Sequence, residues 1–347
     1  MGGTTAAASA LLAACTSVQD AQNGGKSGPF PGTPGWRFVF VNHVTTNSFF
    51  VPTRSGLADA AALLGIPEPQ WTGSENGNVA QMASAMETAI NGKADGIAIA
   101  LTDDNAFIDL TKRALGQGIP VIAYNAGAAG NFPLTYVGQD LYLSGFRMGQ
   151  RIAQKVTTGE ILVGIAQPGG NNVQPRLDGI TDALKQAAPG VQVQSVNTGA
   201  EQAGELNAMT AAYTGNTAVK GIYAVDAGST AACAKVITDH GLSGKIGAGG
   251  FDLLDDTVAG VKSGALDFTI DQSPYLQGFL SVLYLYLYRL SGTLIAPPAT
   301  DTGLTFVTKE NVGPYATAHS RFEGGDNKDV IAMPGAIPLP PASVLSR

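Results

Sequence analysis

The chain has few of the residues that reactive chemistry and highly charged partners require. Only 14% of its 347 residues are charged, the net charge is −7, and there are three histidines and two cysteines. The basic residues are scattered, so the electrostatic footprint of a nucleic-acid-binding protein is missing. Two cysteines make no disulfide framework, and Cys233 is expected to be a small core residue within a helix. The histidines show no metal spacing, so we expect no metal site and place them on the surface or in loops.

Long apolar runs are also absent, which argues against a membrane span. No segment supplies about 20 uninterrupted apolar residues, the length that crosses a bilayer. The most apolar stretch, residues 275–290, is interrupted by Gln277 and Arg289. It therefore predicts a buried amphipathic helix.

The start of the chain has the character of a secretory signal. A run of small apolar residues, 6–14, leads to Cys15, which is typical of a lipoprotein box. Residues 16–35 are polar and rich in Gly, Pro, Ser and Gln, which favours a flexible tether. We therefore treat residues 1–35 as a signal remnant with a tether, and expect a lipid anchor on Cys15 and an extracytoplasmic location.

The rest of the chain alternates short apolar strands with amphipathic helices, and the pattern runs through twice. Strands are expected at 36–41, 66–71, 96–101, 120–124 and 134–137, and again at 160–166, 191–196, 221–225, 246–250 and 266–270. Such alternation indicates parallel sheets covered by helices on both faces. The fold class is therefore α/β, with two similar doubly wound lobes.

Three segments are expected to join the lobes. Crossings are predicted at Gln139-Asp140, at Ser273-Pro274, and between the Pro-rich stretch 296–302 and a strand at 304–307. The first lobe would comprise residues 36–139 and 274–302, and the second 140–273 and 303–347. Several crossings form a hinge whose few residues absorb lobe closure.

The stretch from Lys245 to Gly278 carries the most specific functional signal. Its two predicted strands end on Phe251-Asp252 and Asp271-Gln272. Ligands bind outside the carboxyl ends of strands in open α/β sheets. An aromatic ring, an acid and an amide there, without an adjacent His, Cys or Lys, suit holding a neutral polyhydroxylated molecule better than reacting with it. Asp252 could instead merely cap the next helix.

Polar and aromatic residues follow the other predicted strands in the same way. The further candidates for ligand binding are Asn47, Phe49, Phe50, Asp103, Asn125, Asn172, Arg176 and Asp226. Carboxylates and amides engage adjacent hydroxyl groups, while aromatic faces cover the C–H surface of a sugar. Structural alternatives remain: a helix cap for Asp103, a turn for Asn125, core packing for the two phenylalanines and a solvated charge for Arg176.

Taken together and in order, several motifs resemble one family. They are Asn47-Ser48-Phe49-Phe50, Gly96-Ile97-Ala98-Ile99, Gly118-Ile119-Pro120-Val121-Ile122, Val137-Gly138-Gln139-Asp140, Arg176-Leu177-Asp178-Gly179, Gly249-Gly250-Phe251-Asp252 and Gln272-Ser273-Pro274. From about Arg37 to Thr308 the chain is similar to the periplasmic sugar-binding proteins of ABC importers, of the ribose-binding type.

The resemblance implies a function and roles for the residues. Two lobes would close on one sugar and be recognised by a membrane permease, with ATP hydrolysed by a separate subunit. The binding protein would be a monomer without enzymatic activity or cofactor. The resemblance assigns sugar contacts to Asn47, Phe49 and Phe50 in the first lobe, to Arg176, Asp226, Asp252 and Gln272 in the second lobe and hinge, and an aromatic wall to Phe251.

Departures from the ribose type leave the sugar open. Where that type has Asp-Arg, this chain has Asn125-Ala126, and Asp226 replaces an asparagine. The first lobe thus lacks one carboxylate and one guanidinium, which admits another pentose, a hexose or an acyclic polyol. The tail beyond Lys309 is longer than the family pattern.

Two other classes fit the sequence less well. An NAD-type oxidoreductase would carry Gly-x-Gly-x-x-Gly after the first strand, but Asn-His-Val-Thr-Thr-Asn follows Val41. Repressors related to the lactose repressor begin with a helix-turn-helix, and here a signal-like run and a tether occupy that place. A sensor-type binding protein for a small polar signal stays open.

Overall fold

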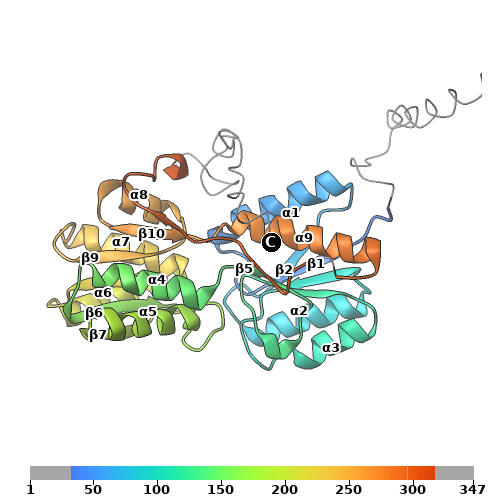
Figure 1. The fold of residues 1–347 in the computed structure, drawn as a ribbon, viewed down its shortest axis with the longest axis horizontal. Helices are drawn as coiled ribbons and strands as arrows, with labels where there is room; N and C mark the ends of the chain where they lie inside the picture. Colours follow the sequence, from blue (N-terminus) through green and yellow to red (C-terminus); the bar gives the residue numbers. More distant parts are fainter. Residues whose placement is uncertain (1–32, 295, 317–347) are drawn as a thin grey trace, which may run out of the picture.

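The computed structural model describes residues 33–294 and 296–316, which form two α/β lobes lying side by side (Figure 1). The predicted lipid site at Cys15, most of the tether, His319 and most of the tail lie outside these residues. Among the helices of residues 33–294 and 296–316, none is long and apolar enough to span a bilayer. These same residues hold no group of three or more His, Cys, Asp or Glu side chains placed to bind a metal ion.

The N-terminal lobe is built on one sheet of six described strands, in the order β11-β5-β4-β3-β1-β2. All of its pairings are parallel. The strands are β1 (Phe38–Asn42), β2 (Gln70–Gly73), β3 (Gly96–Ile99), β4 (Val121–Tyr124), β5 (Tyr136–Gly138) and β11 (Ala299–Asp301). The helices are α1 (Val51–Leu64), α2 (Val79–Asn91), α3 (Ile108–Gly116) and α9 (Pro274–Ser291). The central strands are buried throughout, as a sheet covered on both faces requires.

The C-terminal lobe repeats this plan, with described strands in the order β12-β10-β9-β8-β6-β7. They are β6 (Thr158–Ile165), β7 (Gly190–Asn197), β8 (Gly221–Ala224), β9 (Gly247–Phe251), β10 (Phe268–Asp271) and β12 (Thr305–Val307). Strand β12 runs antiparallel to β10, and the other pairings are parallel. The helices are α4 (Leu141–Ala153), α5 (Gln174–Ala187), α6 (Gln202–Gly215), α7 (Ala227–Asp239) and α8 (Asp255–Ser263). The two doubly wound lobes predicted from the sequence are thus confirmed.

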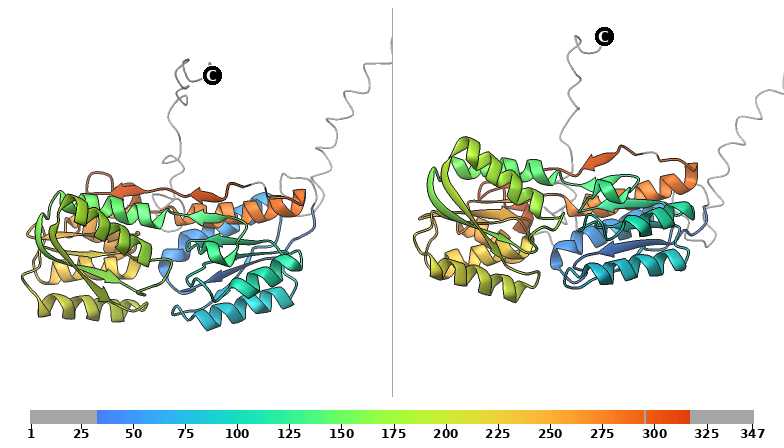
Figure 2. Two further views of the ribbon diagram at one scale, coloured as in Figure 1. Left: turned by 60° about the horizontal axis from the view of Figure 1, so that its bottom comes forward. Right: turned by 90° about the horizontal axis from the view of Figure 1, so that it is seen from below.

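Within the described residues the chain passes between the lobes three times, between β5 and α4, between β10 and α9, and between β11 and β12. Figure 2 shows β11 and β12 running one after the other along the same edge of the two lobes. Strand β11 falls inside the Pro-rich stretch that the sequence suggested was only a connection. Strand β11 pairs with β5 at the edge of the sheet. This edge exists only once the lobe has folded, so the local sequence pattern does not predict the strand.

A glycine-lined helix contact stands next to a crossing in each lobe. A Cβ atom added at Gly56 of α1 would collide with the carbonyl oxygen of Tyr275 in α9, and one at Gly278 with the carbonyl oxygen of Thr53. In the C-terminal lobe, an atom added at Gly145 of α4 would collide with the backbone of α5. Because only glycine permits this approach, each helix that follows a crossing is fixed closely to its new lobe.

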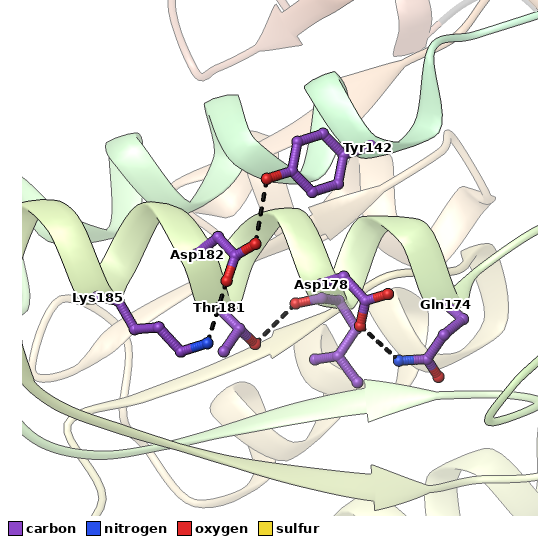
Figure 3. A network of polar contacts seen from close by, with 7 residues as sticks. Tyr142, Gln174, Asp178, Thr181, Asp182 and Lys185 are labelled. Carbon is purple, nitrogen blue, oxygen red and sulfur yellow. Dashed lines mark hydrogen bonds and ion pairs between the residues drawn. The ribbon is translucent and has the colours of Figure 1, made fainter.

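The outer face of the α4–α5 pair is held by exposed polar contacts (Figure 3). Tyr142 on α4 donates a hydrogen bond to Asp182 on α5, at 3.2 Å, and Asp182 also pairs with Lys185 at 3.1 Å. Asp182 and Lys185 lie on the surface of the lobe, away from the space between the lobes. Asp182 therefore offers a carboxylate control for experiments on the site.

Candidate functional site

A cleft lies between the lobes, at the carboxyl ends of strands in both sheets. Most of the residues predicted from the strand ends lie at this cleft. They are Asn47, Phe49, Phe50 and Asn125 from the N-terminal lobe, and Asn172, Arg176, Asp226, Asp252 and Gln272 from the C-terminal lobe and the second crossing. Side chains of both lobes therefore face one space.

Asn125 and Asp252 occupy equivalent positions in the two lobes. Asn125 directly follows β4 and Asp252 directly follows β9, and these strands hold the same place in the two sheet orders. Both residues have left-handed backbones, with φ of 62° and 73°. Asn and Asp tolerate this conformation better than other side-chain-bearing residues. The strained turn aims each side chain out of its sheet end and toward the cleft.

A directed chain of hydrogen bonds joins these two positions across the crossing. The Nδ2 of Asn125 donates to Oε1 of Gln277 at 3.2 Å, and Nε2 of Gln277 donates to Oε1 of Gln272 at 3.0 Å. The Nε2 of Gln272 then donates to Oδ1 of Asp252 at 2.6 Å. An ionised carboxylate only accepts, so Asp252 sets the orientation of every amide behind it. The buried Gln277 on α9 was noted in the sequence only as a polar interruption.

Arg176 is held rigidly in the C-terminal-lobe wall, which is the part of the cleft lining that the C-terminal lobe supplies. Its guanidinium lies over the Phe251 ring at 4.0 Å, and Nη1 donates to the carbonyl of Val225 at 2.9 Å. The Nη2 donates to Oε1 of Gln139 in the first crossing, at 3.0 Å. Burial lowers the pKa of Arg176 and neighbouring Asp252 raises it, and the group stays a cation at any ordinary pH. The alternative of a solvated surface charge does not hold, since Arg176 is 2% exposed.

Asp226 has both carboxylate oxygens engaged by main-chain N–H groups. Oδ1 caps α7 by accepting from Ser229 N at 2.9 Å, and Oδ2 accepts from Ala166 N at 2.9 Å. Burial raises the pKa of Asp226, and these backbone donors counteract that rise. Burial likewise raises the pKa of Asp252 to about 6, against the lowering effects of Arg176 and Gln272.

The N-terminal-lobe wall is aromatic and amidic. Asn47 caps the short turn Ser48–Phe50 by accepting from the N–H of Phe49 at 2.9 Å. Phe49 meets Phe50 edge-on, with ring centroids 4.7 Å apart. Phe50 is 2% exposed and belongs to the core of its lobe, whereas Phe49 packs against Ala227, Ala231 and Leu254 of the other lobe. The two phenylalanines thus connect the core of the N-terminal lobe with the surface of the C-terminal lobe.

Two predicted site residues stand apart from the cleft lining. Asp103 accepts hydrogen bonds from Asn105 N and Ala106 N, both at 2.8 Å, as a residue that caps a turn does. Phe251 is fully buried beneath the Arg176 guanidinium and supports it from behind.

His43 lies in the loop that follows β1, and the sequence placed the histidines on the surface or in loops. The sequence did not assign it to the site, where it is 8% exposed and lines the cleft. Its ring meets Phe50 edge-on, and Nε2 lies 3.2 Å from Nδ2 of Asn172 in the other lobe. Burial lowers the pKa of His43 to about 4, so the imidazole is neutral near pH 7. A single histidine has no spacing signal, which explains why sequence reasoning missed it.

Buried polar atoms without partners concentrate at this site. Among residues 33–294 and 296–316, nine buried side-chain nitrogen or oxygen atoms have no hydrogen-bond partner. Four of the nine belong to cleft residues: His43 Nδ1, Asn172 Oδ1, Arg176 Nε and Glu205 Oε2. Such groups are costly unless something pairs with them. They include donors and acceptors, and hydroxyl groups, which both donate and accept, can satisfy both kinds.

The chain matches known binding proteins along most of its length. The profile of the periplasmic binding protein domain matches residues 38–292. A xylose/arabinose-binding protein of Sulfolobus acidocaldarius is 45% identical over 323 residues, covering 88% of this chain and 79% of that protein.

Solved structures agree with this match. An ABC transporter solute-binding protein of Burkholderia graminis, in complex with D-arabinose, is 25% identical with a TM-score of 0.76, covering 83% of this chain and 100% of that one. A solute-binding protein of Agrobacterium vitis with bound D-fucose is 26% identical, also with a TM-score of 0.76, covering 81% and 98%.

Proposed function

The chain belongs to the periplasmic binding protein domain family, and from that premise we propose that it captures one neutral pentose of the xylose and arabinose class between its lobes. It is an extracytoplasmic solute-binding protein that serves ABC import of carbohydrate, and not an enzyme. The oxidoreductase alternative is therefore set aside.

The observation that carries the proposal is the set of four unpaired polar atoms at the cleft. They come from both lobes, with His43 in one and Asn172, Arg176 and Glu205 in the other. A ligand with several hydroxyl groups, held between the lobes, can pair with all of them at once. The 45% identical relative, which carries xylose and arabinose in its name, supports pentoses within that class.

Lobe closure is the proposed mechanism. The sugar binds the C-terminal-lobe wall, the lobes rotate about the three crossings, and the N-terminal-lobe rings cover it. The closed form then presents both lobes to the permease. Direct contacts between the lobes, from Asn171 to Leu101 and Thr102 and from Asn172 to His43, belong to the closed arrangement in this proposal.

Isothermal titration calorimetry of the purified protein with xylose and arabinose tests the proposal. D-Fucose, D-allose and myo-inositol serve as comparison ligands. A bound sugar at a hundred times its Kd raises the free energy of unfolding by about 2.7 kcal/mol, so thermal melting gives a second readout. Binding of hexoses or polyols alone would move the specificity away from pentoses. Binding of small polar signals alone would favour the sensor alternative, and would refute sugar capture.

We also propose that Cys15 carries a lipid and that the protein acts as a monomer. Both rest on sequence, because Cys15 lies outside the described residues. The full chain should partition into the detergent phase after expression in a secreting host, and Cys15→Ser should move it to the aqueous phase. Equal partitioning of both forms would refute the anchor, and a dimer mass in light scattering would refute the monomer.

A further inference from the structure

Glu205 is a buried carboxyl group that the sequence analysis did not single out. It lies in the first turn of α6, is 2% exposed, and lines the cleft next to Asp226. Burial and the neighbouring charge of Asp226, with which it forms a side-chain hydrogen bond, raise the pKa of Glu205 to about 9. Its Oε2 has no hydrogen-bond partner in the hydrogen-bond geometry of the described residues.

Gly228 shows that the fold makes room for this carboxyl group. A Cβ atom added at Gly228 would collide with Oε2, Cδ and Oε1 of Glu205. Gly228 is helical and is not among the described residues with positive φ, so its backbone does not require glycine. The missing side chain at 228 instead provides the space in which the Glu205 carboxyl group lies, over the first turn of α7.

Asp226 is suited to be the charged partner of Glu205. Both of its oxygens accept from main-chain N–H groups, and it lies at the N-terminus of α7, where negative charge is favoured. Glu205 has no such donors on Oε2. Two adjacent buried carboxyl groups do not both ionise, so the proton resides on Glu205.

On the basis of the proposed sugar-binding function, we propose that Glu205 and Asp226 share one proton as an acid pair that contacts one sugar hydroxyl group and loosens the sugar when the proton is lost. A neutral carboxyl group both donates and accepts, so it can satisfy a hydroxyl group and Asp226 together. Loss of the proton places two negative charges side by side and removes the donor.

Other titratable groups also face this pair. Arg176 on α5, Asp252 after β9 and His43 in the N-terminal lobe line the same cleft, and Cys233 lies on α7. Asp252, with a pKa of about 6, and His43, with a pKa of about 4, change charge below pH 7. The test therefore uses alkaline pH, where Arg176 stays charged.

The first experiment measures the Kd for xylose calorimetrically between pH 7.5 and pH 10. Wild-type affinity should fall by up to about tenfold across this range, whereas the affinity of Glu205→Gln, which keeps the size and a donor but cannot lose a proton, should stay nearly constant between pH 7.5 and pH 10. Asp182→Asn, on the exposed face of α5, is the matched control and should follow wild type. The proposal would be overturned if the Kd for xylose depended on pH in the same way for wild type and for Glu205→Gln.

A double-mutant cycle tests the geometry independently of pH. Gly228→Ala should weaken xylose binding at least tenfold in the presence of Glu205, because the methyl group displaces the carboxyl group. The same substitution should change affinity less than twofold in a Glu205→Ala background. Equal effects in both backgrounds would contradict the role of Gly228.

A measurement without sugar separates this inference from the proposed function. If neither xylose nor arabinose produces heat, the function proposal fails, and the acid pair is judged by urea unfolding. The folded-state pKa of Glu205 is raised, so its stabilising contribution is complete below pH 4 and declines as pH rises toward 9. The unfolding constant of wild type relative to Glu205→Gln should increase up to about tenfold per pH unit in that window. Superimposable pH curves would refute the shared proton.

Discussion

Asn125 and Asp252 hold equivalent positions in two lobes of the same plan, with the same left-handed backbone, but one is an amide and the other an acid. The difference extends to the walls around them. The N-terminal-lobe wall presents amides, a neutral histidine and two phenylalanines, whereas the C-terminal-lobe wall presents an arginine and three carboxyl groups. The two lobes thus share one fold but present different kinds of side chain to the cleft.

The comparison indicates how the lobes share the work of binding. Charged groups make the stronger hydrogen bonds, so the C-terminal-lobe wall should supply most of the affinity. In the proposed closed complex, the aromatic wall would cover the C–H surface of the sugar and exclude water. Four changes test this comparison: two exchange the acid and the amide, one protonates Asp252, and one removes a contact between the lobes.

Exchanging the acid for an amide should have the largest effect. Asp252→Asn keeps the shape and tolerates the left-handed backbone, but it removes a charged acceptor beside Arg176. A hydrogen bond to a charged group contributes about 1.5 to 3 kcal/mol, so the calorimetric Kd for xylose should rise at least tenfold. The exposed Asp182→Asn undergoes the same chemical change and should bind as wild type does. Full affinity in Asp252→Asn would remove this carboxylate from the site.

Acid should weaken binding through the same wall. The pKa of Asp252 is raised to about 6, so the carboxylate that we propose as an acceptor for the sugar is lost as pH falls below that value. Affinity should then decrease up to about tenfold per pH unit. Stability of the sugar-free protein should move the other way, because a raised carboxyl pKa stabilises the folded state most below its unfolded value near 4 and loses this effect as pH rises through 6. Calorimetry and urea unfolding between pH 4 and pH 7 measure both. Asp252→Asn should make both curves less steep, while Glu205 and Asp271, whose pKa values are also raised, still contribute to the slope of the stability curve.

The reciprocal exchange should act on the fold as well as on the ligand. Asn125→Asp replaces the amide that donates to Gln277 with an acceptor, so two oxygens face each other in a buried site. Gln277 can rotate to donate to the new carboxylate only by turning its own oxygen toward Gln272. One unpaired buried group costs about 1 to 3 kcal/mol, which urea unfolding should register. Unchanged stability would show that the hydrogen bonds from Asn125 through Gln277 and Gln272 to Asp252 do not need one fixed direction.

Particular residues show how far sequence reasoning reached. Asn47, Asp252 and Gln272 were found because parallel strands end at one edge of a sheet, which is a local rule. Glu205 was not found, because its place at the cleft depends on the space left by Gly228, more than twenty positions later. Strand β2 was expected at 66–71 but forms at Gln70–Gly73, beyond the two prolines that cannot donate to a ladder.

The smallest effect should come from a contact that joins the lobes outside the sugar site. Asn171 of the C-terminal lobe donates through Nδ2 to Asp104 Oδ1 at 2.9 Å, and its backbone N–H donates to the carbonyl of Thr102 at 3.1 Å. The same Nδ2 also donates to the carbonyl of Leu101 at 3.3 Å. Asn171→Ala removes this one amide donor with both of its bonds and keeps the backbone bond, so the closed form should lose only about 0.5 to 1.5 kcal/mol. The dissociation rate of xylose should therefore rise by roughly threefold to tenfold, with the association rate little changed, in stopped-flow fluorescence. A larger loss than that of Asp252→Asn would mean that contacts between the lobes, and not the charged wall, supply most of the affinity.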